Sequence, residues 1–256
     1  MLTRHLRTIV ACGAVAALCV VADASLRGQQ SAPLPPASDL VARYVRAIGG
    51  EAALRRITSI HARGTFEIVG TGISGTLEML SARPAKALVK VQLPGDARVE
   101  TGFDGKVGWE IDPQRGPAVL ASRRLSEVAD DAWFDAPLHK PDHVRLMTTA
   151  AKTTYDRRPA YQVKVVFVSG NETVEYYDVE TGLLIGTEST RDTTMGLVPS
   201  ASFLREYKKF GPMMQPTVLS QRFLGIDQVL RLTSFEYDAV PPSTFDIPVQ
   251  IKALIK

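Results

Sequence analysis

Apolar and polar residues alternate along most of this chain with a period of two. That period predicts half-buried β-strands, because successive side chains of a strand point to opposite faces of its sheet. Short clusters of Gly, Pro and Asp separate the runs, which is typical of an antiparallel meander. The expected strands cover residues 59–68, 76–79, 88–93, 98–103, 108–111, 149–156, 160–168, 173–179, 183–192, 202–210, 217–225 and 228–237.

Other segments follow a helical period instead. In "SDLVARYVRAIGG" apolar residues recur at helical spacing, Ser38 or Asp39 can cap the start, and the glycine pair ends the run. Residues 51–57 add a further helical turn or two, and residues 122–138 predict one or two helices between the strands. The apolar, turn-rich segment 195–201 is expected to be an irregular loop. We therefore predict a mainly β fold with an N-terminal helix and a helical insert.

The first residues have the layout of a secretory signal peptide. Basic residues lead into the apolar run Ile9–Val21, and the A-x-A pattern of residues 22–24 follows. This run is shorter than the ~20 residues that a membrane-spanning helix needs. We expect residues 1–24 to be a cleaved signal peptide, residues 25–37 a flexible lead-in and residues 38–256 a single domain in the periplasm.

Composition and charge narrow the possible functions. The chain has 30 Lys and Arg against 27 Asp and Glu, a formal net charge of +3, and the two signs are interspersed. This balance argues against nucleic acid as a partner, since such domains usually carry a basic excess. Both cysteines, Cys12 and Cys19, lie in the expected signal peptide. The mature chain is therefore expected to have no disulfide, no thiol nucleophile and no Cys-based metal site.

Gly70, Gly72 and Gly75 spell G-x-G-x-x-G directly after a predicted strand. A dinucleotide site needs these glycines to open a helix, with an acidic residue ~20 positions further on. Here the following residues alternate as in a strand, and Pro84 arrives before a crossover helix can form. We interpret the triplet as a β-hairpin turn that needs positive φ.

The histidines offer a weak metal hypothesis. In "LHKPDH", His139 and His143 lie on either side of Asp142, a spacing that fits a metal site loosely. Pro141 interrupts any helix there and no third strong ligand follows, so we interpret the segment as a solvated loop. His61, on the polar side of the first strand, is expected at the surface.

Further motifs for chemistry are missing from the sequence. There is no G-x-S-x-G nucleophile elbow and no P-loop. The acidic residues of "ADD" (Ala129 to Asp131) and Asp135 are explained by a charged helix surface. Arg83, at a strand end in "SARP", is by composition alone a surface arginine with a carboxylate partner. We expect no cofactor, no metal and no catalytic residue, while a site assembled from distant residues stays an alternative.

The run "GTLEMLSARPAKALVKVQLPGDARVETGFDGKVGWEIDP", residues 75–113, resembles the LolA-like family of periplasmic lipoprotein carriers. A Gly-started strand ends in Arg-Pro, a strand runs to a Pro turn, the next runs into Asp-Gly-Lys, and a Trp-containing strand ends in Asp-Pro. The C-terminal "FDIP", residues 245–248, is similar to the family's closing Phe-x-x-Pro.

This resemblance implies an open, strongly curved antiparallel half-barrel, LolA- or LolB-like, whose helices plug its concave side over an apolar cavity for acyl chains. It also implies that Arg83 latches the helical lid through hydrogen bonds to loop backbone in the empty state. An ordinary sandwich or barrel core would show the same alternation of residues. The residues expected to line the cavity are Phe66, Leu77, Met79, Val89, Val91, Val99, Phe103, Trp109 and Ile111.

The function implied is a non-catalytic periplasmic carrier that shields lipid or lipoprotein acyl chains, with an inner-membrane release complex and an outer-membrane acceptor as partners. The chain departs from a typical carrier in being longer, with the surplus in residues 138–210. Two alternatives stay open. One is an envelope sensor or interaction module of the same fold. The other is an envelope enzyme with scattered site residues such as His139, Asp142 and His143.

Overall fold

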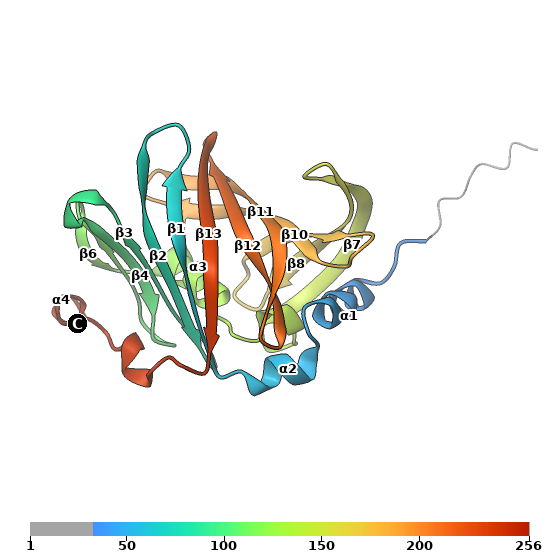
Figure 1. Ribbon diagram of the computed structural model, residues 1–256, viewed down its shortest axis with the longest axis horizontal. Helices are drawn as coiled ribbons and strands as arrows, with labels where there is room; N and C mark the ends of the chain where they lie inside the picture. The colour runs from blue at the N-terminus through green and yellow to red at the C-terminus, as the bar shows by residue number, and fades with distance from the viewer. Residues whose placement is uncertain (1–32, 256) are drawn as a thin grey trace, which may run out of the picture. The chain divides into compact units, whose positions relative to one another are not determined.

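Thirteen antiparallel strands dominate the computed structural model, which describes residues 33–255 (Figure 1). They form one sheet in the order β6-β5-β4-β3-β2-β1-β13-β12-β11-β10-β9-β8-β7. The strands are β1 (Ser59–Ile68), β2 (Ile73–Ala82), β3 (Lys86–Gln92), β4 (Arg98–Phe103), β5 (Gly108–Asp112), β6 (Gly116–Val119), β7 (Val144–Tyr155), β8 (Arg158–Phe167), β9 (Glu172–Asp178), β10 (Leu184–Thr193), β11 (Gly196–Phe210), β12 (Met213–Phe223) and β13 (Ile226–Tyr237).

The sheet is open, and its two edges are β6 and β7. These strands are consecutive in the chain, so the segment that joins them has to cross from one edge of the sheet to the other. Short helices occupy this crossing and both ends of the domain, and one more, η1, lies between β3 and β4. They are α1 (Ala37–Ala47), α2 (Glu51–Arg56), η1 (Pro94–Asp96), α3 (Ser122–Asp131), η2 (Ala136–Leu138), η3 (Pro242–Phe245) and α4 (Val249–Lys252). The mainly β fold with an open curved sheet, an N-terminal helix and a helical insert is thereby confirmed.

The main hydrophobic core lies between α1 and the β7–β9 end of the sheet. Leu40, Val41 and Val45 lie on the buried face of α1, as the helical spacing predicts. They belong to one cluster with Val163 and Val165 of β8, and both valines are almost completely buried. Full burial of such side chains is worth about 1.5–3 kcal/mol each. This core fixes α1 against one end of the sheet, on the same side as the crossing segment.

The C-terminal segment packs on the sheet at its other end. Phe245 of η3 and Ile251 of α4 are fully buried against Trp109, Leu80 and Leu88. In Figure 1 this segment lies at the lower left, next to β3 and β4 and away from α1 and α2. The C-terminal segment therefore packs in a cluster separate from the core that contains α1.

Two local predictions are corrected by the structure. The helix α1 begins at Ala37, and neither Ser38 nor Asp39 caps it. The segment 195–201 is not an irregular loop, because β11 begins at Gly196 and pairs with β10. Pro199 is tolerated there because the pairing of β11 with β12 begins only at the next residue.

The glycine triplet belongs to a hairpin, as predicted. Gly70 and Gly72 lie between β1 and β2 and have φ of 79° and 74°, a region that favours glycine. Gly75 has a different role inside β2. A Cβ there would lie 1.9 Å from the carbonyl oxygen of Gln92 on β3, so the close approach of the two backbones requires glycine.

Several predictions concern residues that the structure does not describe. The signal peptide, residues 1–24, lies outside the described residues, as does most of the lead-in, residues 25–37. From Leu34 onward the chain forms one compact unit by its contacts. No helix within the described part of the chain is long and apolar enough to cross a membrane.

Candidate ligand cavity and its lid

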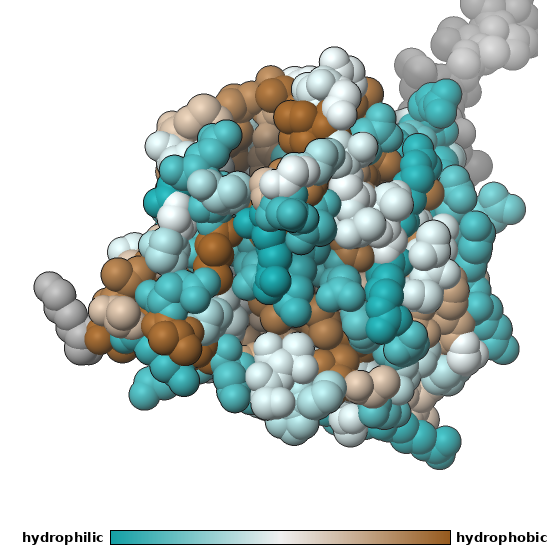
Figure 2. Space-filling view, turned by 60° about the vertical axis from the view of Figure 1, so that its left-hand side comes forward, coloured by the Kyte–Doolittle hydropathy of each residue, from teal (hydrophilic) through white to brown (hydrophobic). Residues whose placement is uncertain are grey.

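A cavity of about 520 Å³ lies between the sheet and the crossing segment. We call residues 122–143 the lid. The volume falls within the range of small-molecule sites in proteins. Figure 2 shows a hollow near the top of the molecule with apolar residues on its inner wall. The cavity is lined by Met79, Asp130, Asp131, Ala136, His139, His143, Phe167, Thr173, Glu175, Leu184, Thr187, Arg191, Ser202, Phe203, Leu204, Leu219, Ser220, Gln221 and Leu230.

One wall of the cavity is apolar and is shared by strands that are far apart in sequence. Met79 of β2, Leu219 of β12 and Leu230 of β13 line it and belong to one hydrophobic cluster. The register brings them together, because Leu219 pairs with Leu230 and β13 in turn pairs with β1. None of the three is fully buried, so each keeps apolar surface available toward the cavity.

The structure brings most of the predicted lining residues together on one face. Phe66, Leu77, Met79, Val89 and Val91 belong to the same apolar cluster as Leu219 and Leu230. Val99 pairs with Val91 and so lies on that face too. Of these, Met79 lines the cavity itself.

Phe103, Trp109 and Ile111 lie elsewhere. Phe103 packs beneath α3 in a cluster with Ala85 and Ala132. Trp109 and Ile111 belong to the cluster built around the C-terminal segment, on the opposite face. Trp109 pairs with Gly102, the neighbour of Phe103 on β4. Since neighbouring residues of a strand point to opposite faces, Trp109 lies on the face of the sheet opposite to Phe103. The assignment of Trp109 and Ile111 to the cavity is therefore corrected.

Arg83 ties the lid to the end of α2. Its Nε donates to the carbonyl oxygen of Ile57 at 2.8 Å, and an NH2 donates to that of Leu54 at 3.1 Å. Another NH2 donates to a carboxylate oxygen of Asp135 in the lid at 2.6 Å. The guanidinium also lies 4.7 Å from the centre of the Phe134 ring. Arg83 is thus the partner of a carboxylate. Its bonds to backbone carbonyls are at the end of α2, and its bond to the lid goes to the side chain of Asp135.

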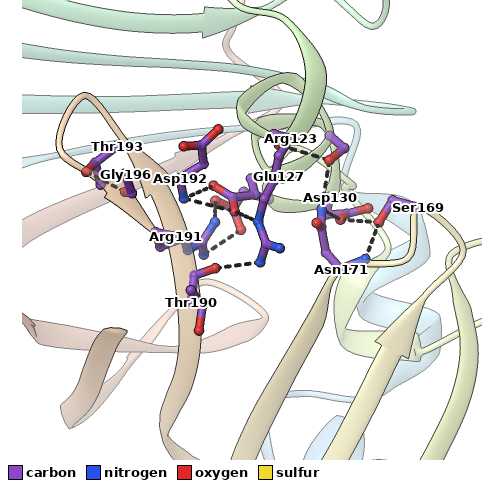
Figure 3. Close-up of polar contacts among 12 residues, drawn as sticks. Arg123, Glu127, Asp130, Ser169, Asn171, Thr190, Arg191, Asp192, Thr193 and Gly196 are labelled. Carbon is purple, nitrogen blue, oxygen red and sulfur yellow. Dashed lines mark hydrogen bonds and ion pairs between the residues drawn. The ribbon is translucent and has the colours of Figure 1, made fainter. Parts of the chain in front are cut away.

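A second set of lid contacts, which the sequence did not predict, comes from β10. Arg191 makes two hydrogen bonds to the carboxylate of Asp131, at 2.8 and 3.0 Å. The carboxylate of Glu127 accepts from the backbone N–H of Asp192. Figure 3 shows Glu127, Arg191 and Asp192 lying between α3 and the strand. The lid is therefore held along its helix as well as at Arg83.

The helix α3 forms further hydrogen bonds with β10 and with the segment between β8 and β9. Arg123 donates to the backbone carbonyl oxygen of Thr190 at 2.9 Å. Asp130 accepts from Ser169 and from Asn171, both at 2.7 Å (Figure 3). Asp130 and Asp131 thus do more than charge a helix surface. Two adjacent acidic residues on a predicted helix were the available signal in the sequence, but their partners lie about 40 to 60 residues further on.

The lid ends in two buried histidines with different partners. His139 Nε2 lies 2.9 Å from Glu175 Oε2, and the hydroxyl of Tyr177 donates to the same carboxylate. His143 stacks on Trp133, with ring centroids 5.1 Å apart, and neither of its ring nitrogens has a hydrogen-bond partner among the described residues. Burial acts to lower the pKa of His139, but the charge and hydrogen bond of Glu175 outweigh it and raise that pKa. Burial lowers the pKa of His143.

We expect the pKa of His139 to fall when Glu175 is replaced by Gln, because burial then acts without the carboxylate. The raised pKa also means that the ion pair contributes to the free energy of unfolding in full below the unfolded-state pKa of 6.5. That contribution is lost as the pH rises through the folded-state pKa. An NMR titration of the ring protons measures the shift. The control is Glu172→Gln, an exposed carboxylate on the same strand. An unchanged His139 pKa in Glu175→Gln would contradict the assignment.

The metal alternative receives no support from the side-chain arrangement. His139 is bonded to Glu175 and His143 is stacked between aromatic rings, while Asp142 is exposed. Residues 33–255 contain no group of three His, Cys, Asp or Glu side chains that could hold a metal ion.

No protein-family model and no curated protein matches the sequence. Solved structures match the fold instead. A LolA superfamily protein from Nitrosomonas europaea aligns over 84% of this chain and 99% of its own, with 12% identity and a TM-score of 0.55. A DUF1329 family protein from Desulfovibrio piger aligns over 83% and 98%, with 14% identity and a TM-score of 0.57.

The same likeness extends to a protein whose description names lipoproteins. An outer membrane lipoprotein-sorting protein domain from Vibrio parahaemolyticus aligns over 82% of this chain and 95% of its own, with 10% identity and a TM-score of 0.53. The chain therefore has a LolA-like fold, an open half-barrel with helices on its concave side. This confirms the fold that the motifs between residues 75 and 113 predicted.

Proposed function

We propose that this protein is a non-catalytic carrier that shields the acyl chains of a lipid or lipoprotein in the periplasm. The observation that carries the proposal is the cavity of about 520 Å³, apolar on the side of Met79, Leu219 and Leu230 and bordered by a lid with polar attachments. The sorting-domain description of one structural relative supports the same class of ligand.

The physical chemistry of transport fits such a cavity. Moving an acyl chain out of water is worth ~0.8 kcal/mol for each buried methylene, so a chain that leaves a membrane needs an apolar wall throughout its transfer. The apolar cluster extends beyond the cavity along β1, β2 and β3, through Phe66, Val89 and Val91. A chain longer than the cavity can lie along this wall once the lid moves.

The lid contacts give the carrier a way to open and close. The hydrogen bonds of Arg83 and of the Asp131–Arg191 pair are directional. Each of them can be exchanged for a hydrogen bond to water when a ligand displaces the lid. We propose Arg83 as the latch of the empty state. As partners we propose a release complex at the inner membrane and an acceptor at the outer membrane.

A charge in the apolar wall tests the proposal. Met79→Asp is expected to weaken binding of a fluorescent fatty acid by at least about tenfold, because an ionised carboxylate cannot be buried against an acyl chain without a partner. Fluorescence titration of the purified mature protein measures the affinity. Leu146→Asp is the matched control, since Leu146 is 57% exposed and lies outside the cavity.

Mass spectrometry of the material that co-purifies with the mature chain provides an independent measurement. We expect lipid or acylated peptide in the wild type and much less of it in Met79→Asp. A wild-type protein that takes up no lipid probe and carries no lipid would contradict the carrier function.

A further inference from the structure

The concave face of the sheet is chemically divided. On β1, β2, β3 and β13 it presents the apolar cluster described above. On β9 to β12 polar residues line the cavity beside apolar ones such as Leu184, Leu204 and Leu219. The cavity is therefore mainly apolar, with a hydrogen-bonding strip across these strands. A chamber for acyl chains alone does not need that strip.

The hydrogen-bonding strip is an ordered row across four strands. Gln221 of β12 pairs with Ser202 of β11, Ser202 pairs with Thr187 of β10, and Thr187 pairs with Glu175 of β9. Directly paired residues of antiparallel strands point to the same face, and their Cβ atoms lie about 4.5–5.5 Å apart. All four residues line the cavity.

Three members of this row have unused hydrogen-bonding capacity. Within residues 33–255 the side chains of Gln221, Ser202 and Thr187 form no hydrogen bond, although the backbone carbonyls of Thr187 and Ser202 accept from Tyr155. Together the three side chains offer donors and acceptors of both kinds, two hydroxyls and one amide. Such groups bind well to a ligand that also carries both, such as a polyol.

Arg191 and Glu175, two charged groups beside the row, already have partners within the protein. Arg191 uses its fork on Asp131, and Glu175 is bonded to both His139 and Tyr177. A phosphate or carboxylate headgroup is best recognised by a free guanidinium fork, and a cationic headgroup by a free carboxylate. No guanidinium fork is left over among these cavity residues, so an anionic headgroup would enter without a counter-charge. The carboxylate of Asp130, which also lines the cavity, accepts only from the neutral side chains of Ser169 and Asn171.

We infer that the ligand of this cavity is an amphiphile with an uncharged, hydroxyl-rich headgroup, such as a sugar or glyceryl group. Its acyl chain lies along Met79, Leu219 and Leu230, and its headgroup is hydrogen-bonded by Gln221, Ser202 and Thr187. This inference rests on the proposed lipid-binding function and specifies the headgroup that the cavity selects.

Three detergents with the same dodecyl chain separate headgroup from chain. They are dodecyl maltoside, which is neutral and hydroxyl-rich, dodecylphosphocholine, which is zwitterionic, and dodecyl sulfate, which is anionic. Isothermal titration calorimetry of the mature protein, with each detergent below its critical micelle concentration, is expected to give at least about tenfold tighter binding of the maltoside. That preference corresponds to one or two net hydrogen bonds.

A double variant locates this preference. Thr187→Val combined with Ser202→Ala removes two hydroxyls with little change of shape, and it is expected to weaken maltoside binding about tenfold while leaving dodecylphosphocholine binding within about twofold. The matched control is Thr190→Val on the same strand, which is exposed and does not line the cavity. Circular dichroism confirms that each variant is folded.

The outcomes distinguish the two levels of the proposal. Equal affinities for the three detergents, or a double variant that loses all of them equally, would overturn the headgroup inference and leave the carrier function intact. Failure of every dodecyl compound to bind would contradict the carrier function itself, and the headgroup inference with it.

Discussion

Trp109→Ala is expected to lower the free energy of unfolding by about 3–5 kcal/mol, the usual cost of truncating a buried aromatic side chain. Trp109 is only 1% exposed and packs with Leu80, Leu88, Phe245 and Ile251. The substitution removes a large apolar surface and leaves a cavity that the short helices η3 and α4 cannot fill. Chemical denaturation of the mature protein measures the loss.

The same variant tests the correction made to the ligand-binding wall. Since Trp109 lies on the opposite face of the sheet from Met79, the folded Trp109→Ala protein is expected to bind a fluorescent fatty acid as the wild type does. The control is Trp109→Phe, which keeps most of the apolar volume and is expected to cost less stability. Unchanged stability combined with lost ligand binding would show instead that Trp109 faces the ligand.

Arg83→Leu is expected to destabilise the protein by about 2–4 kcal/mol and to loosen the lid. The substitution leaves the carboxylate of Asp135 without its ion-pair partner and removes the donors from two backbone carbonyls at the end of α2. Because the Arg83 side chain is only 26% exposed, water replaces these bonds incompletely. We expect hydrogen exchange to accelerate in residues 122–143 more than in the strands.

Two controls separate the latch from a general loss of charge. Arg55→Leu removes an arginine whose partner Glu51 is on the same exposed helix, and surface pairs of this kind contribute at most about 1 kcal/mol. Arg83→Lys keeps the charge without the planar fork and is expected to restore only part of the stability. If lid exchange and ligand release stay as in the wild type, Arg83 has no part in lid opening.

The lid is attached at several points through charged side chains. Arg83 bonds to Asp135, Arg191 bonds to Asp131 and Glu175 bonds to His139. Salt weakens these pairs where they reach water. A lid held at both ends and along its helix moves only when several contacts are exchanged together, which favours two states over gradual opening.

Much of the fold was determined locally and could be predicted from the sequence. The period of two predicted most of the strands. Gly70 and Gly72 indicated a hairpin, because the positive φ of a turn glycine is set by neighbouring residues. The buried stripe of α1 was likewise visible in its helical spacing. The order of motifs in residues 75–113 was sufficient to predict the half-barrel.

Only the tertiary structure decided which face each strand turns to the cavity. Alternation divides the residues of each strand into two faces. The register between strands, such as β4 with Phe103 and β5 with Trp109, determines which residues share the concave face, and register is not visible in the sequence of a single strand. Composition also misassigned the segment 195–201, because pairing with a neighbouring strand outweighs turn propensity.

The lid contacts and the polar row depended on the tertiary structure for a similar reason. Asp131 meets Arg191 across 60 residues of chain, and Gln221, Ser202 and Thr187 lie side by side only after three strands have paired. The sequence by itself determined that this chain forms a curved antiparallel sheet with an apolar face. Folding decided that part of that face is polar, because strand pairing places distant residues side by side.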